Sequence, residues 1–429
     1  MKKFSNRSRR HFLGRSLAFS AAYMGLQPQL FADQAKKKSE MRARIKGLLY
    51  GSLIGDAAGG PVEFKPHKET KHVLADVRGW DAGRKINGAE IEKLANSLPL
   101  LDYQELRPDA EPYGQWMKNA AAGTVTDDSR HKIVLLRMLG KFDGRRPLSR
   151  RDLASAYVAF GESKTVRSRP NYQALCAEAM REHVLAAKWI LGKRKTDQAL
   201  PPERIWGGIG TCCGQMTLPP VACVFVGQPV LAYQAAYHLA FFDNGPALDI
   251  NSAIVAAMAT ALAADVELSR AQRWNKVADT MRRVDPYHYS DIPFVGRQLI
   301  EWLDIASQIA TEAQGSPKKL FDLLEAKGKP RYWWDAHFIL VCVVAMFDFC
   351  EGNGLAAMHL ALDFGHDTDS VSQLIGALTG AMEGESVFPK QMRDAVQTQL
   401  VKDYDESVES WADLLIRLNA SDVAVFELE

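Results

Sequence analysis

The chain has 429 residues, of which 47% are hydrophobic and 24% are charged, a composition typical of globular proteins and not of disordered or fibrous ones. Its formal net charge of +2 comes from 53 basic and 51 acidic residues. Six of the basic residues and none of the acidic ones lie in the first 32 positions, so the remainder carries 47 basic against 51 acidic residues, a net charge of −4. This balance argues against nucleic acid as a partner, because nucleic-acid binding depends on an excess of positive charge.

A pair of arginines near the start of the chain is followed by an apolar stretch. The pair lies in Ser8-Arg9-Arg10-His11-Phe12-Leu13, and the apolar residues run from Leu17 to Leu26. This order is typical of a twin-arginine export signal, which we expect to end near Ala32. The apolar stretch is too short and too polar for a stable membrane anchor. We therefore expect the twin-arginine export machinery as a partner and a soluble mature protein that is periplasmic or secreted; the alternative is a chance basic patch.

The six cysteines include no CxxC pair. Cys212 and Cys213 are adjacent and cannot readily bridge to each other. Neither a disulfide framework nor a zinc ribbon is indicated, and we expect buried thiols.

From residue 33 onward, helical periodicity returns at both ends of the chain, and no linker rich in proline, glycine or serine divides it. The pattern predicts one large α-helical domain over residues 33–429, with few and short strand signals. Helices are expected at Ile45–Gly59, Ser129–Gly140, Arg151–Phe160, Asn171–Leu191, Val230–Phe242, Ile250–Leu268, Phe294–Ala313, Phe338–Cys350, Leu355–Phe364, Val371–Gly384 and Ser407–Leu418.

A long polar insert lies at about residues 65–122. It contains Trp80, Tyr103, Tyr113 and Trp116. The insert either caps a pocket and supplies an aromatic ring for stacking, or forms a surface excursion that buries its own aromatic residues. The aromatic run Arg331–Asp335 has two similar interpretations: it either forms the rim of a pocket or packs into the core.

The first predicted helix carries a glycine at every fourth position, namely Gly47, Gly51, Gly55 and Gly59. Each glycine weakens an isolated helix by about 1 kcal/mol relative to alanine, so tertiary packing must favour the stripe. A neighbouring helix can approach closely along this face. Gly376 and Gly380 repeat the pattern in a later helix, and we expect both helices near the centre of the core. Close approach either brings Glu63 towards the acidic motifs described next or serves packing alone.

Two acidic motifs open helical segments far apart in the sequence. They are Thr126-Asp127-Asp128-Ser129 and Gly365-His366-Asp367-Thr368-Asp369-Ser370. Carboxylates and hydroxyls suit Mg²⁺ or Mn²⁺, whereas zinc prefers thiolates and imidazoles. The alternative is that these residues are helix N-caps. Crowded carboxylates repel one another unless a cation, protonation or solvent relieves them, which favours a metal site.

Together these segments resemble the ADP-ribosylglycohydrolase family, all-helical hydrolases that remove ADP-ribose from modified proteins. The resemblance runs from about Ile45 to Pro389. It is carried by three motifs in the family's order and a weaker fourth one, namely Gly51–Phe64, Gly123–Ser129, Gly365–Ser370 continuing into Gly376–Ala381, and the glycine loop Gly207–Cys212.

The resemblance implies a compact, all-α multi-helix bundle with a dinuclear metal site at its centre. Two Mg²⁺ ions, or Mn²⁺, would be held by Thr126, Asp127, Asp128, Asp367, Asp369 and Ser370. Glu63 matches the family's active-site glutamate, and either Glu63 or Asp128 would accept the proton of the attacking water.

Substrate contacts are expected from the glycine loop and from one residue of the second acidic motif. Backbone N–H groups around Gly208, Gly210 and Thr211 can approach a phosphate. The family's asparagine and downstream arginine are not evident in this loop. His366 stands where many relatives have a small glycine, and it either binds substrate or has a structural role.

The resulting hypothesis is a metal-dependent hydrolase that cleaves an N- or O-glycosidic bond to ADP-ribose or a related ribosyl or glycosyl group. Its substrate would be a small molecule or a protein-linked conjugate. The alternatives are a non-catalytic, metal-containing ligand-binding protein on the same scaffold and a structural Ca²⁺ protein.

Overall fold

A computed structural model describes residues 36–64, 120–163, 180–195, 199–291 and 293–428. The predicted export signal, the four aromatic residues of the insert and residues 171–179 lie outside these ranges. Residues 1–43 and 44–429 form separate compact units, and the following description concerns the second unit.

The described part of this unit consists of helices and connecting turns, and it contains no strand beyond two isolated β-bridges, Leu148 with Phe426 and Thr211 with Asp335. The all-α prediction is therefore confirmed. The first helix, described over residues 36–59, is called the glycine-stripe helix. The other elements are η1 (Gly60–Val62), α4 (Asp127–Leu139), α5 (Arg150–Gly161), α8 (Arg181–Ile190), η4 (Pro202–Gly208), α9 (Cys213–Thr217), α10 (Val221–Val224), α11 (Pro229–Leu239), α12 (Ala247–Leu262), α13 (Arg270–Arg283), η5 (Tyr289–Asp291), α14 (Gln298–Ala313), α15 (Pro317–Lys327), α16 (Ala336–Phe349), α17 (Gly354–Phe364), α18 (Thr368–Glu383), η6 (Glu385–Val387), α19 (Lys390–Tyr404) and α20 (Val408–Asn419).

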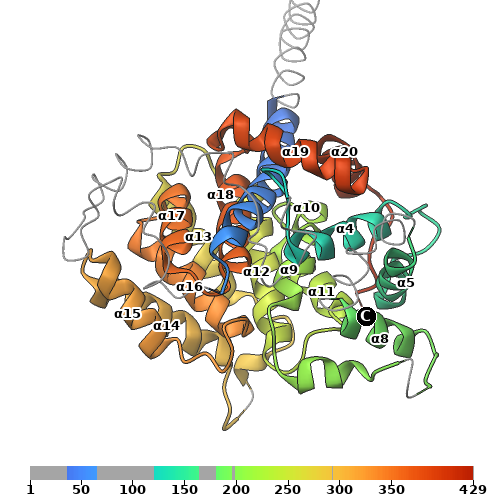
Figure 1. The fold of residues 1–429 in the computed structure, drawn as a ribbon, viewed down its shortest axis with the longest axis horizontal. Coiled ribbons are helices and arrows are strands. Elements are labelled where there is room, and N and C mark those ends of the chain that lie inside the picture. Colours follow the sequence, from blue (N-terminus) through green and yellow to red (C-terminus); the bar gives the residue numbers. More distant parts are fainter. Residues whose placement is uncertain (1–35, 65–119, 164–179, 196–198, 292, 429) are drawn as a thin grey trace, which may run out of the picture. The chain divides into compact units, whose positions relative to one another are not determined.

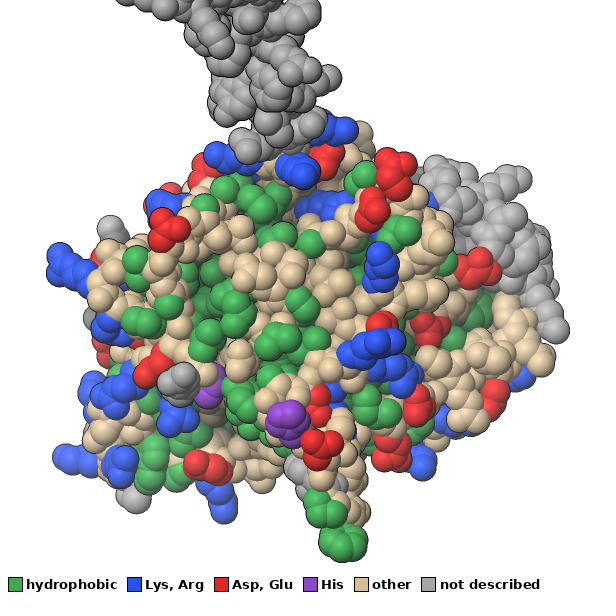
Figure 2. All heavy atoms as spheres, turned by 180° about the vertical axis from the view of Figure 1, so that it is seen from behind, with side chains coloured by type: hydrophobic (Ala, Val, Ile, Leu, Met, Phe, Trp, Pro, Cys, Tyr) green, Lys and Arg blue, Asp and Glu red, His purple; other side chains and the backbone are tan. Residues whose placement is uncertain are grey.

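Among the described helices, none has the length and apolar character needed to cross a bilayer. On the face shown in Figure 2, acidic and basic side chains are interspersed around areas of apolar side chains.

Several helix boundaries differ from the sequence expectations. The helix expected from Phe294 begins instead at Gln298, because Phe294 and Gly296 have φ angles of 74° and 68°, which no α-helix accommodates. Helix α12 ends at Leu262 and not at Leu268. Ser269 then caps α13 through a reciprocal capping box with Gln272. Helices α13, α15 and α19 were not singled out from the sequence, because each buries only a narrow stripe of its surface.

Helix α18 lies at the centre of the packing. All of its residues except the last are buried, and it contacts α4, α9, α12, α16 and α17. Helix α16 is apolar on nearly every side and packs against α14, α17 and α18. A helix that is apolar all round can be stable only in the interior, so α16 and α18 together define the core.

The close neighbour expected along the glycine stripe is α18, and Figure 1 shows the two helices close together. A Cβ atom added at any of its four glycines would overlap the backbone of α18 or of the residues beside it. The facing pairs are Gly47 with Gly380, Gly51 with Gly376, Gly55 with Ser372 and Gly59 with Asp369. The absence of side chains therefore allows backbone-to-backbone contact along the stripe, and its last member lies against the first turn of α18.

We predict that Gly51→Ala destabilises the protein by about 1–3 kcal/mol or more, because the new methyl group overlaps the carbonyl group of Gly376, which cannot rotate away. Urea unfolding followed by far-UV circular dichroism measures the loss. Gly161→Ala is the matched control, since a Cβ there lies 3.8 Å from Val184 in ordinary contact. Equal stability of the two variants would contradict direct backbone packing at Gly51.

Candidate metal centre

The two acidic motifs meet at the starts of α4 and α18. Thr126 caps α4, because its Oγ1 accepts a hydrogen bond from Asp128 N at 3.3 Å. The same hydroxyl donates to Asp369 Oδ2 at 2.8 Å and so joins the two motifs. Asp367 occupies the N-cap position of α18, but its side chain makes no capping hydrogen bond. Helix capping thus accounts for Thr126 and leaves Asp367 without a capping role.

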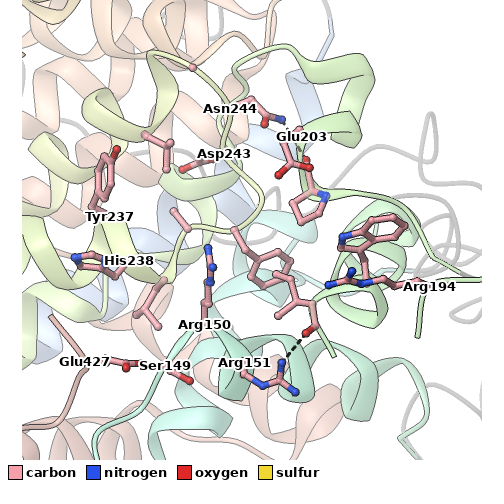
Figure 3. A pocket seen from close by; sticks show the side chains of 18 residues that line it. Ser149, Arg150, Arg151, Arg194, Glu203, Tyr237, His238, Asp243, Asn244 and Glu427 are labelled. Carbon is pink, nitrogen blue, oxygen red and sulfur yellow. Dashed lines mark hydrogen bonds between the residues drawn. The ribbon is translucent and has the colours of Figure 1, made fainter. Parts of the chain in front are cut away.

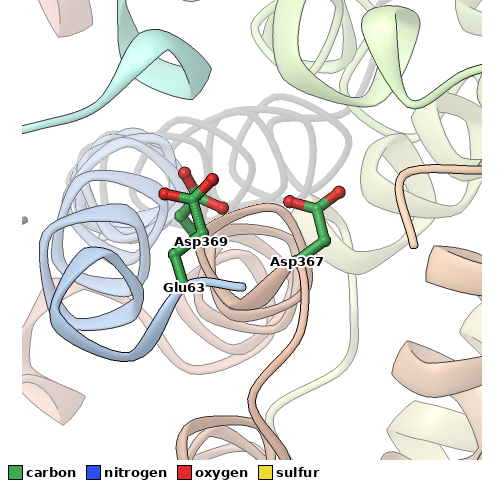
Figure 4. Close-up of side chains that lie close together, drawn as sticks. All are labelled: Glu63, Asp367 and Asp369. Carbon is green, nitrogen blue, oxygen red and sulfur yellow. The ribbon is translucent and has the colours of Figure 1, made fainter. Parts of the chain in front are cut away.

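Four of the predicted ligands and Glu63 form two overlapping carboxylate groups. One group contains Glu63, Asp367 and Asp369, and the other contains Asp127, Asp128 and Asp369. Within each group, one oxygen from each residue lies within 4.8 Å of the others. Figure 4 shows Glu63 and Asp369 close together, with Asp367 preceding α18 beside them. Asp369 belongs to both groups, so one residue links the two sets of carboxylates that could hold a cation.

Ser370 completes the predicted set. Its Oγ lies 3.2 and 3.3 Å from the two carboxylate oxygens of Asp128. The structure therefore brings together all six predicted ligands, although their metal-binding roles remain predictions. Cys212, which sequence reasoning did not include, lies at the edge of the cluster, with its Sγ 3.9 Å from Asp367 Oδ2 and 3.6 Å from Ser370 Oγ.

Burial and mutual repulsion make the cluster reluctant to ionise. Burial, followed by the charge of Asp127, raises the pKa of Asp369 from 3.8 to about 7. Burial and the charge of Asp369 raise the pKa values of Glu63, Asp128 and Asp367 well above the ordinary range. Crowded carboxylates with raised pKa values are the expected electrostatic state of a cation site without its cation, and the mainly oxygen donor set suits Mg²⁺ or Mn²⁺.

One buried lysine lies beside the carboxylates. Lys132 Nζ donates to the carbonyl oxygen of Met216 at 3.2 Å and to Gln373 Oε1 at 3.0 Å. Burial lowers the pKa of Lys132, while the nearby carboxylates, Asp128 first, act in the opposite direction. Its single charge cannot balance several carboxylates.

Asp56 supports the cluster from the glycine-stripe helix. Its carboxylate accepts hydrogen bonds from Thr126 N at 2.9 Å, from Ser129 N at 3.0 Å and from the Ser129 hydroxyl. Asp56 is completely buried, so it holds the start of α4 in place and is not a surface residue. The sequence alone allowed Asp56 either to support the acidic motifs or to lie on the helix surface. The sequence feature that points to the supporting role is a carboxylate within a helix of small residues that pack closely.

Glu63 is held near the cluster by the chain that follows it. The backbone N–H of Phe64 donates to the carbonyl oxygen of His366 at 2.5 Å. This bond ties the end of the glycine-stripe helix to the residue that precedes Asp367. The sequence left open whether Glu63 approaches the acidic motifs, and in the structure it lies beside Asp367 and Asp369.

The side chain of His366 contacts other side chains of the protein. Its ring stacks on Trp333 with a centroid separation of 3.7 Å, and its Nε2 lies 2.9 Å from Glu325 Oε1. The ring is 4% exposed, and the backbone has a left-handed φ of 62°. These contacts favour a structural role, and substrate contact by His366 remains a prediction.

The glycine loop reaches the cluster through Cys212. Gly208 has a φ of 83°, a left-handed conformation that suits glycine. The loop is joined to the aromatic run: Cys212 N donates to Trp334 O at 3.0 Å, and Ala336 N donates to Gly210 O at 3.3 Å. Thr211 is buried as a whole residue, and its carbonyl oxygen accepts a hydrogen bond from Asn251 at 3.4 Å.

The aromatic run has an exposed edge near Glu63. The rings of Tyr332 and Trp334 stack at 5.1 Å, and the ring of Phe64 meets Trp334 edge-on at 6.2 Å. Phe64 and Tyr332 are 44% and 38% exposed. The run therefore combines packing, through Trp333, with a surface on which a planar or sugar ring could stack.

These features define an all-helical protein with a buried acidic centre between two helix starts. The chain belongs to the ADP-ribosylglycohydrolase family, whose model matches residues 37–423. Membership suggests a glycohydrolase acting on an ADP-ribosyl substrate. No curated protein matches the chain. Among solved structures, an "ADP-ribosylglycohydrolase-related protein complex" is 19% identical, with a TM-score of 0.49, over 89% of this chain and 99% of that chain.

We predict that ionisation of Asp369 opposes folding of the metal-free protein. Its folded pKa of about 7 lies above the ordinary 3.8, so unfolding releases a proton between these values. This residue alone should lower the unfolding free energy by up to about 1.4 kcal/mol per pH unit as pH rises from about 4 to about 7. Asp369→Asn removes this contribution, so in chelator the variant should gain stability relative to wild type over this range.

Chemical unfolding at several pH values measures that difference. Replacement of the exposed Asp422 by Asn is the control, and it should follow the wild-type pH profile. Parallel profiles for Asp369→Asn and wild type would show that the cluster carries no such ionisation cost.

Proposed function

We propose that the protein is a metal-dependent glycohydrolase that cleaves an N- or O-glycosidic bond to ADP-ribose or a closely related ribosyl group. Family membership supports the reaction class and an ADP-ribosyl substrate. The observation that carries the metal dependence is the pair of carboxylate groups that share Asp369.

The residues proposed to hold two Mg²⁺ ions, or Mn²⁺, are Thr126, Asp127, Asp128, Asp367, Asp369 and Ser370. When bound, such ions orient ribose hydroxyls and lower the pKa of a water molecule. The chain itself contributes the fixed geometry, because the hydroxyls of Thr126 and Ser370 each link the two motifs.

Two carboxylates are candidates for the proton acceptor. Glu63 belongs to one carboxylate group and Asp128 to the other. A carboxyl whose pKa is raised towards neutrality is suited to proton transfer at physiological pH. Asp128 already interacts with Ser370 Oγ and opens α4, which favours a positioning role. We therefore assign proton acceptance to Glu63.

The glycine loop is the proposed contact for the diphosphate. Among the described residues, the backbone N–H group of Gly210 has no backbone hydrogen-bond partner, and Gly210 is partly exposed. We propose that this N–H group contacts the anion, with the buried Thr211 directly behind it. Gly208 supplies the left-handed turn before them. The exposed edge of Phe64 and Tyr332 would contact a ring near Glu63.

The cellular setting is proposed from the sequence alone. The twin-arginine pattern supports export to the periplasm or beyond, where the substrate is a small-molecule or protein-linked ADP-ribosyl conjugate.

Metal titration followed by hydrolysis assays tests the function. We expect metal-stripped protein to bind Mg²⁺ or Mn²⁺ in calorimetry and then to hydrolyse ADP-ribosyl conjugates. Asp369→Asn should lose metal binding, because both carboxylate groups need this residue. Glu63→Gln should retain binding of the ion proposed at Asp127, Asp128 and Asp369, while hydrolysis falls by about 10²–10⁴-fold. Replacement of the exposed Glu267 by Gln is the control and should change neither property.

Three results would contradict the proposal. Metal binding with no hydrolysis of any ADP-ribosyl, nucleoside or other glycosyl conjugate would favour the non-catalytic ligand-binding alternative. Stabilisation by Ca²⁺ with no ligand response would favour a structural calcium site. Full activity of Glu63→Gln would transfer the proton-accepting role to Asp128.

A further inference from the structure

We propose that a second cavity, between α5, α8 and the end of α11, binds a small phosphate ester. The cavity has a volume of about 860 Å³, within the usual range for small-molecule sites. Figure 3 shows that its wall comes from several elements distant in sequence. None of its lining residues belongs to the acidic cluster, so it is a separate site.

Three arginines give the cavity its anion-binding character. Arg150 extends from the first turn of α5 into the cavity, as Figure 3 shows, and among the described residues it has no hydrogen-bond or ion-pair partner. The guanidinium of Arg194 lies over the ring of Trp189, 5.3 Å from its centroid. Arg151 Nη1 donates to the carbonyl oxygen of Ile190 at 2.9 Å. Stacking and hydrogen bonding hold two of the three guanidinium groups in place, which reduces the entropy cost of binding an anion.

The acidic side chains in the cavity do not cancel this charge. Asp243 is buried, and its oxygens accept from Gly214 N at 3.0 Å and from Asn251 Nδ2 at 2.8 Å. Burial also raises the pKa of Asp243 to about 8, so this carboxyl is mostly neutral at pH 7. Glu203 and Glu427 are exposed, as Arg150, Arg151 and Arg194 are, so the lining carries three guanidinium groups against two ionised carboxylates.

The remaining lining suits an organic body attached to the phosphate. Tyr237, Phe241 and Leu248 present apolar surface, while Asn244 and Glu203 present groups that can pair with hydroxyls or ring nitrogens. His238 and Tyr237 are fixed by hydrogen bonds of 2.8 Å to Tyr287 and Tyr289, respectively. An ester such as a nucleoside monophosphate uses both parts of the lining, whereas inorganic phosphate uses only the arginines.

Calorimetric titration of the full chain in chelator tests the proposal, because chelation removes phosphate binding that depends on metal. The probes are AMP, ribose 5-phosphate and inorganic phosphate. We expect AMP or ribose 5-phosphate to bind more tightly than inorganic phosphate. The double variant Arg150→Ala/Arg194→Ala should weaken this binding at least tenfold, since both lost contacts are charge-assisted.

Two controls distinguish binding in the cavity from a general effect of net charge and from binding at the acidic cluster. Arg145→Ala removes one positive charge, half of that removed by the double variant, from a side chain that is 87% exposed and lies outside the cavity, and it should leave affinity unchanged. Asp367→Asn/Asp369→Asn alters the acidic cluster and should bind the esters as wild type does, whatever the fate of the hydrolase activity. Chemical unfolding confirms that each variant is folded.

The proposal is overturned by any of three results. These are no binding of either ester at millimolar concentration, equal affinity for esters and inorganic phosphate, or equal effects of the double arginine variant and Arg145→Ala.

Discussion

The backbone contact between the glycine-stripe helix and α18 is the packing interaction on which the acidic centre depends. At Gly59 the stripe ends against Asp369 itself, so the distance between helix axes also sets where the following segment can lie. That segment carries Glu63 and is then fixed by the bond from Phe64 to His366. A wider crossing, with ordinary side chains in the stripe, would move Glu63 away from the carboxylates of α18. Close backbone packing of these two helices therefore determines where Glu63 lies relative to the carboxylates of α18.

The same region contains several buried carboxylates that repel one another. Burial and like charge raise the pKa values of Glu63, Asp128, Asp367 and Asp369 together. The fold holds these groups with directional bonds from neutral donors, such as Thr126 and Ser370, in addition to the single charge of Lys132. Neutral donors fix positions without satisfying the carboxylates as a divalent cation would. Positive charge, supplied by a cation or by protonation, would relieve the repulsion that these donors leave in place.

Sequence patterns predicted those parts of the site whose position follows from the spacing of residues along the chain. The four-residue glycine interval predicted a close helix neighbour, and the matching interval in Gly376 and Gly380 placed both helices near the centre of the core; the structure shows that they pack on each other. The all-α fold and the grouping of the acidic motifs also followed from local patterns. Asp56, Lys132 and Cys212 were less visible, because their partners are remote in sequence and no local pattern reveals them. The start of α14 was misplaced because the left-handed conformation of Phe294 is not encoded by its side chain.

The turn around Asp243 lies between the arginine-lined cavity and the glycine loop. One oxygen of Asp243 holds Gly214, and the other holds Asn251, whose amide in turn contacts Thr211 O at 3.4 Å. A Cβ at Gly210 would lie 3.1 Å from Asn244 O, so the loop and the turn are in tight contact. Asp243 and Asn244 also line the cavity. These hydrogen bonds are buried, and Asp243 also lines the cavity, so the bonds that position the glycine loop beside the acidic centre also shape one wall of the cavity.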